Sequence, residues 1–129
     1  MAVPEQALAA KLKDTAGVTA LVSTRIYPMY RPGTVLPAIV YEVSQDIPSN
    51  YAGGTTDTSQ MFLAVDCIAS TYAGARALSA VVESTLSGWT DSDGRVWHLT
   101  STSDDVGDPM TGQSVPEYFA VTHTYTVWH

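Results

Sequence analysis

The sequence predicts an α+β fold: a four-stranded, mainly antiparallel sheet with helices packed on one face, in the order α-α-β-β-α-β-β. Three observations lead to this expectation. Apolar residues recur with helical spacing near the N-terminus and again in the middle of the chain. Apolar and polar residues alternate in two separate pairs of segments, as in β-hairpins. The 129 residues contain no linker and no internal repeat, so we expect a single domain over residues 1–129.

Two helices are expected at the N-terminus. Pro4 suits the first turn of a helix over residues 3–13, and the acidic Glu5 follows it. The helical stripe consists of Ala7, Leu8 and Leu12. Asp14 or Thr15 can cap a second, shorter helix that continues through Val18, Leu21 and Val22.

A turn, a loop and a hairpin are expected next. Arg25-Ile26-Tyr27-Pro28 predicts a turn, and residues 31–36 predict a loop because they include Pro32 and Gly33. Alternating apolar residues predict strands over residues 39–47 and 60–69. The second of these is apolar on both faces, which predicts a central position in the sheet or contact with a partner.

Residues 48–59, between these strands, are rich in Gly, Thr, Ser, Asn and Asp and have no hydrophobic period. They predict a long hairpin loop that is mobile in the free subunit and becomes ordered against a neighbour. Tyr51 is its one large amphipathic side chain and the candidate anchor, beside Gly53 and Gly54.

The second half of the chain predicts a helix over residues 71–89, a tight turn at Asp91-Ser92-Asp93-Gly94 and a strand over residues 95–102. A polar loop is expected over residues 103–117. Its acidic residues Asp104, Asp105 and Asp108 are candidate interface residues. Threonine at every second position predicts a final strand over residues 118–128.

The net charge argues against binding of duplex DNA. Thirteen acidic and six basic residues give a net charge of −7, whereas DNA binding needs clustered Lys and Arg. Such a surface suits DNA that slides past without adhering. The sequence has no apolar run of signal-peptide or membrane-spanning length, and its single cysteine excludes an internal disulfide. We expect a soluble protein made in a reducing cytoplasm.

No residue pattern predicts catalysis, a metal site or a cofactor. His98, His123 and His129 occur singly, and a hydrogen-bonded, partly buried strand histidine is the preferred interpretation of His123. Cys67 lies among apolar residues and is expected to be an inert buried thiol. Asp91-x-Asp93-Gly94 begins like a calcium loop, but it lacks the later acidic positions and is better interpreted as a turn.

Four segments resemble a known family. They are residues 12–22 leading into Arg25-Ile26-Tyr27-Pro28, then Leu36-Pro37-x-Ile39-Val40-Tyr41, then the aspartate-bearing strand before Tyr72-x-x-Ala75-x-x-Leu78, and finally Val127-Trp128. In this order and at this length, they are similar to the tail terminator or tail-completion proteins of tailed bacteriophages. Similar subunits occur in gene transfer agents.

The resemblance implies a structural protein of the virion. Such subunits form a hexameric ring at the head-proximal end of the tail, stop polymerisation of the tail tube and meet the head connector. The implied partners are other copies of the chain, the tube protein and the connector, with DNA passing through and no membrane involved. A head-closure or neck protein is the alternative within this class. A small ligand-binding or regulatory α+β domain is the alternative outside it.

Overall fold

The chain forms three helices and one sheet of five strands. The computed structural model describes residues 3–33, 35–51, 54–106 and 118–128, and the side chains of these residues except at positions 48–51 and 54–58. Its elements are α1 (Pro4–Asp14), α2 (Ala16–Val22), β1 (Ile26–Pro28), β2 (Ala38–Tyr51), β3 (Gly54–Ala69), α3 (Tyr72–Leu86), β4 (His98–Val106) and β5 (Phe119–Trp128). The predicted α+β class is confirmed.

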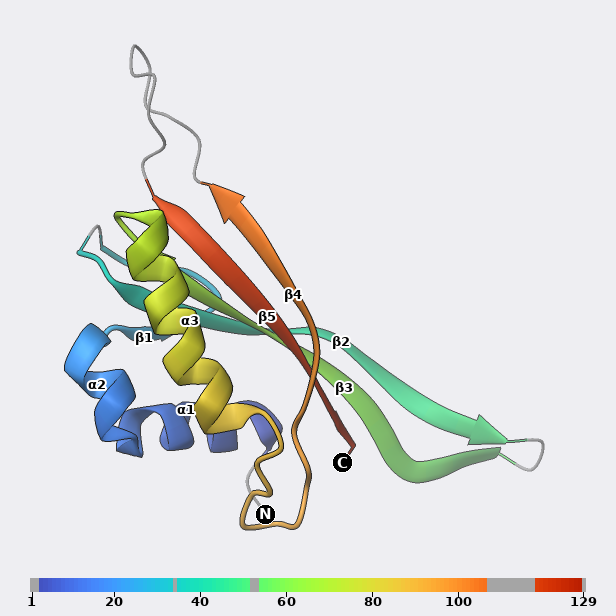
Figure 1. Cartoon of the computed structure of the whole chain (residues 1–129). Coiled ribbons are helices and arrows are strands. Elements are labelled where there is room, and N and C mark those ends of the chain that lie inside the picture. The colour runs from blue at the N-terminus through green and yellow to red at the C-terminus, as the bar shows by residue number, and fades with distance from the viewer. Residues whose placement is uncertain (1–2, 34, 52–53, 107–117, 129) are drawn as a thin grey trace.

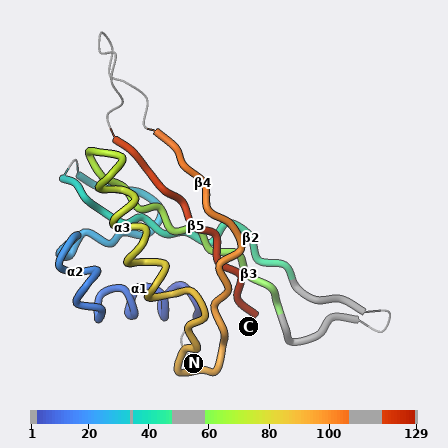
Figure 2. Tube along the Cα trace, viewed as in Figure 1, coloured from blue at the N-terminus to red at the C-terminus, as the bar shows by residue number. Residues whose placement is uncertain are grey.

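The sheet has the strand order β1-β2-β3-β5-β4 (Figure 1). All neighbouring strands are antiparallel except β1 and β2, which are parallel. The trace in Figure 2 shows β5 running beside β4 through the middle of the molecule. The strand that is apolar on both faces, β3, lies at the centre of the sheet, as its sequence predicts.

The prediction of four strands is wrong because the turn expected at Arg25–Pro28 is a short strand, β1. Ile39 N donates a hydrogen bond to Arg25 O, and Met29 N donates one to Tyr41 O, which ties this segment to β2. The side chain of Ile26 is buried beneath the helices. Pro28 is tolerated because β1 is an edge strand. Three residues are too few to show an alternating pattern.

All three helices pack on one face of the sheet, as predicted (Figure 1). The main core joins Leu8 and Leu12 of α1 and Val18 and Val22 of α2 to the sheet. Helix α3 adds Leu78, Val82 and Leu86, and the sheet contributes Ile39, Leu63, Val65, Tyr125 and Val127. Burying each of these large side chains stabilises the fold by roughly 1.5–3 kcal/mol.

The hairpin of β2 and β3 extends beyond the sheet as a two-stranded arm, residues 44–51 and 54–59 (Figure 1). Ile47 pairs with Gln60, and Tyr51 pairs with Gly54. The loop expected over residues 48–59 is therefore mostly paired backbone, which leaves only residues 52–53 between the strands. The sequence gives no strand period here because the arm is not covered by the helices, and backbone pairing needs no alternation of side chains.

The connection from α3 to β4 is organised by the buried carboxylate of Asp91. Its Oδ1 accepts hydrogen bonds from the backbone N of Asp93 and of Arg95, both at 3.0 Å. Its Oδ2 accepts one from Arg95 Nε at 2.7 Å and one from Trp97 Nε1 at 3.2 Å. Burial alone would raise the pKa of Asp91, but the hydrogen bonds from Arg95 and Trp97 outweigh it and hold the pKa below its usual value. The tight turn predicted here is confirmed.

Asp91→Ala should lower the free energy of unfolding by about 3–5 kcal/mol, because it leaves the buried Arg95 guanidinium without its principal partner. The matched control is Asp93→Ala, which removes the second and more exposed carboxylate contact of Arg95. We expect this control to change stability by about 1 kcal/mol or less. Urea denaturation measures both variants, and equal losses would contradict a special role for Asp91.

Candidate interaction surfaces

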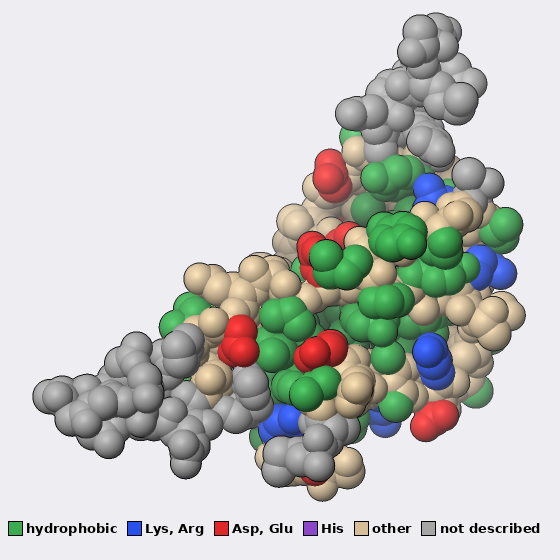
Figure 3. Space-filling view, turned by 180° about the vertical axis from the view of Figure 1, so that it is seen from behind, with side chains coloured by type: hydrophobic (Ala, Val, Ile, Leu, Met, Phe, Trp, Pro, Cys, Tyr) green, Lys and Arg blue, Asp and Glu red, His purple; other side chains and the backbone are tan. Residues whose placement is uncertain are grey.

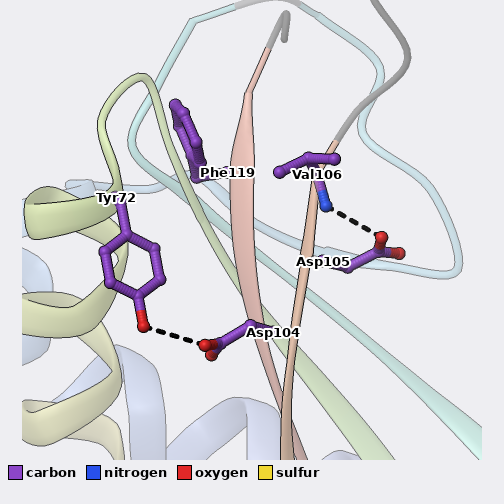
Figure 4. A pocket seen from close by; sticks show the side chains of 5 residues that line it. All are labelled: Tyr72, Asp104, Asp105, Val106 and Phe119. Carbon is purple, nitrogen blue, oxygen red and sulfur yellow. Dashed lines mark hydrogen bonds between the residues drawn. The ribbon is translucent and has the colours of Figure 1, made fainter.

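An open depression of about 310 Å³ lies where the start of α3 meets the end of β4 and the start of β5. It is lined by Tyr72, Asp104, Asp105, Val106 and Phe119 (Figure 4). We call it the edge groove, because β4 is an outermost strand of the sheet. Thr71 caps α3 by accepting a hydrogen bond from Gly74 N at 3.0 Å, which positions Tyr72 at the first turn.

Side chains from different elements meet in the edge groove. Tyr72 donates its hydroxyl hydrogen to Asp104 Oδ2 at 2.8 Å, and Arg76 Nη1 lies 3.5 Å from Asp104 Oδ1. The hydrogen bond to Asp104 raises the pKa of the Tyr72 hydroxyl. The rings of Tyr72 and Phe119 meet edge to face, with centroids 6.3 Å apart. Tyr72 and Val106 nevertheless stay about half exposed, at 46% and 50%.

Asp105 points away from Tyr72, because neighbouring side chains on a strand face opposite sides of the sheet (Figure 4). Its Oδ1 accepts a hydrogen bond from Val106 N at 2.8 Å. On that side of the sheet Asp66 is half-buried and accepts a hydrogen bond from Thr122 at 2.7 Å. Burial raises the pKa of Asp66, and the nearby charge of Asp105 adds to this effect.

The face of the sheet opposite the helices forms a second surface. Figure 3 shows hydrophobic side chains gathered over it, with acidic side chains among them. Val40, Ile68 and Ala120 form a small buried cluster there, against which Leu36 and Tyr118 pack. The guanidinium of Arg31 lies 5.6 Å from the centre of the Tyr118 ring. This arrangement provides apolar contact area rather than a polar reaction centre.

The candidate interface residues predicted from the sequence lie in different parts of the structure. Asp104 and Asp105 lie on β4, so the loop predicted to begin at residue 103 is wrong as far as residue 106. Gly54 pairs with Tyr51 in the arm, away from the edge groove. Gly53 and Asp108 lie outside the described residues, as does the rest of the expected acidic loop.

Sequence reasoning missed Tyr72 and Phe119, which line the edge groove, and Arg76, which contacts Asp104. Tyr72 and Arg76 are four residues apart and lie on one side of a helix, which is the only local signal. Their partner Asp104 follows about thirty residues later, on another element. No periodicity or motif links positions at that separation.

Of the residues weighed for chemistry, His123 and Cys67 are buried, His98 is exposed on β4, and His129 lies outside the described residues. His123 Nε2 lies 2.6 Å from Ser79 Oγ, and His123 Nδ1 lies 2.8 Å from the Tyr125 hydroxyl, with the histidine 1% exposed. Burial lowers the pKa of His123, although the nearby Glu83 opposes this effect. Cys67 is fully buried, and both burial and the neighbouring Asp66 raise the pKa of its thiol. The hydrogen-bonded strand histidine and the buried thiol are confirmed, with His123 buried completely rather than partly.

Comparison with protein families identifies one model that matches this sequence. The family is described as "Tail completion protein gp17", and the match spans residues 6–125. The chain belongs to this tail completion family. The predicted resemblance is therefore confirmed, and membership makes the chain a structural protein of phage-type tails.

Solved structures agree with this fold. A chain of the virion of a native gene transfer agent particle matches with a TM-score of 0.70 and 17% sequence identity. The match covers 97% of this tail completion family member and 92% of that chain. A comparison with curated protein sequences found no match. Among the described residues, no helix is long and apolar enough to cross a membrane.

Stability should fall as the pH drops from about 6.5 toward 5, because His123 resists protonation in the folded state but not in the unfolded chain. The unfolded state then binds the extra proton. The slope should approach, but not exceed, about 1.4 kcal/mol per pH unit. Urea denaturation at a series of pH values measures it. His123→Gln should flatten this part of the profile, whereas His98→Gln, at an exposed position on β4, should leave it unchanged. A profile that His123→Gln does not flatten would contradict the assignment.

Proposed function

We propose that this tail completion protein forms a ring, six-fold when assembled, on the head-proximal end of the tail tube. The ring stops polymerisation of the tube and offers its other face to the head connector. The family match over residues 6–125 is the observation on which this proposal rests. The partners are neighbouring copies of the chain, the tube protein and the connector.

The arm supports a role in assembly. Within the described residues, β1 pairs with β2 only as far as Tyr41, and β5 pairs with β3 only from Gln60 onward. Neither β1 nor β5 therefore extends along the outer edges of the arm. A two-stranded hairpin alone is marginally stable in water, so contact with a neighbour or with the tube would add the missing stabilisation.

The charge supports passage of DNA through the ring. A net charge of −7 disfavours adhesion of a polyanion. We assign Asp105, which points away from Tyr72, and the acidic residues that follow it to the lumen or to one face of the ring. A particle reconstruction with Asp105 on the outer circumference would contradict this assignment.

Particles assembled without this protein test the proposed function. Electron microscopy should show tails longer than normal and without heads, because nothing stops the tube. Tails of normal length beside filled heads would instead identify a neck protein, and intact particles would contradict both roles.

Removal of the arm should block completion of particles and leave the fold intact. Ile47 pairs with Gln60, so residues 48–59 can be replaced by Asn-Gly, which forms a tight hairpin turn. Tyr51→Ala tests the proposed anchor alone. Tyr30→Ala is the matched control, because Tyr30 is a 71% exposed tyrosine outside the arm.

Urea denaturation checks the folding of each arm variant, and the yield of joined heads and tails measures its function. We expect a low yield from both arm variants and a normal yield from Tyr30→Ala. If both arm variants fold and complete particles normally, the arm has no role in assembly.

A further inference from the structure

Charged side chains of opposite sign lie beside the two outermost strands of the sheet, acidic at the end of β4 and basic before the start of β1. On the β4 side, the carboxylate of Asp104 lies in the edge groove near the guanidinium of Arg76, and the carboxylate of Asp105 lies on the other side of the same strand. The nine residues of β4 contain no lysine and no proline, the residues that usually protect an edge strand from pairing. This edge therefore offers unpaired backbone, an exposed apolar rim and excess negative charge.

Basic side chains lie before the start of β1, whereas Glu5 and Glu42 line a separate depression at its end. A depression of about 330 Å³ is lined by Lys13, Thr19, Ser23 and Thr24, directly before Arg25 and β1. We call it the α2 corner. Lys13 is exposed, and Asp14, which follows it, lines a different depression beside Trp89.

Arg25 adds a cation that is held only by carbonyl groups within the described residues. Its Nε donates a hydrogen bond to Pro37 O at 2.7 Å, and its Nη2 lies 3.5 Å from Leu21 O. Leu21 is itself 38% exposed. The guanidinium is thus fixed in place and free to receive a carboxylate from another molecule.

We infer that the edge groove of one copy docks against the α2 corner of the next copy. Asp104 then faces Lys13 and Arg25, and the exposed Leu21 lies near the apolar rim formed by Tyr72 and Val106. The two surfaces differ and lie at opposite edges of one sheet (Figure 1), so the contact is head-to-tail. Head-to-tail contacts close into rings when the rotation per subunit allows it. The inference rests on the proposed ring and names the surfaces that build it.

Cross-linking in assembled particles tests this contact. Val106→Cys and Thr24→Cys place one thiol on each surface and leave the charged residues unchanged, while the native Cys67 is fully buried. A short bismaleimide should link neighbouring copies of the double-cysteine protein. Denaturing gel electrophoresis should then show a ladder of multimers, the largest of which has the size of the complete ring. Each single-cysteine variant should stay monomeric, because its thiol has no counterpart on the facing surface. Dimers from Val106→Cys alone would mean that two edge grooves face each other, which overturns the head-to-tail contact.

A charge-reversal cycle tests the recognition itself. Asp104→Lys and Lys13→Glu, each in the double-cysteine background, should reduce the ladder about tenfold, because each places like charges opposite one another. The combination of both changes should restore it. Glu83→Lys makes the same change of charge at an exposed site on α3 and should have no effect.

The outcomes separate this inference from the proposed function. Electron microscopy of the same particles shows whether a ring is present. If a ring is present but no ladder forms, the assigned contact surfaces are wrong and the proposed ring still holds. Particles with no ring overturn both.

Discussion

The alternation of side chains along β3 is the constraint on which the rest of the structure depends. Met61, Leu63, Val65 and Cys67 face the helices, and each pairs across the sheet with core residues of β5. A shift of register by one residue would turn all four toward the opposite face. Burial of this face therefore fixes β5, and with it β4, as well as the surface on which the three helices pack. It also fixes where pairing ends and the arm begins.

This dependence on burial explains how much of the fold could be predicted. Helix α3 and strands β3 and β5 were predictable because Leu78, Val65 and Tyr125 each belong to a periodic pattern that the core imposes. Strand β1 and the arm were not, because three residues show no period and the arm lies outside the helix-covered core. The end of β4 was missed for the same reason, since all its side chains from Thr100 to Val106 are exposed.

The candidate surfaces show a different limit. Composition drew attention to Asp104 and Asp105, because acidic residues in a polar segment suggest an exposed site, and both side chains are exposed on β4. The groove itself depends on Tyr72 and Phe119, which come from other elements and meet only through the crossing of α3 over the sheet. Family membership indicates the biological setting, a phage-type tail. The geometry indicates which surfaces of the chain are candidates for contacts in that setting.

The buried contacts of His123 with Ser79 and with Tyr125 have a consequence for the groove two helical turns away from Ser79. If α3 slid or rotated on the sheet, buried polar atoms would lose their partners, which is more unfavourable than a shift between apolar surfaces. The contact of Ser79 with His123 therefore fixes how α3 is rotated about its axis and how far it is shifted along β5. Arg76 lies about one turn and Tyr72 about two turns before Ser79 on the same helix, so this contact also determines where they lie. The spacing between the first turn of α3 and the end of β4 is thus determined inside the core, before any partner arrives.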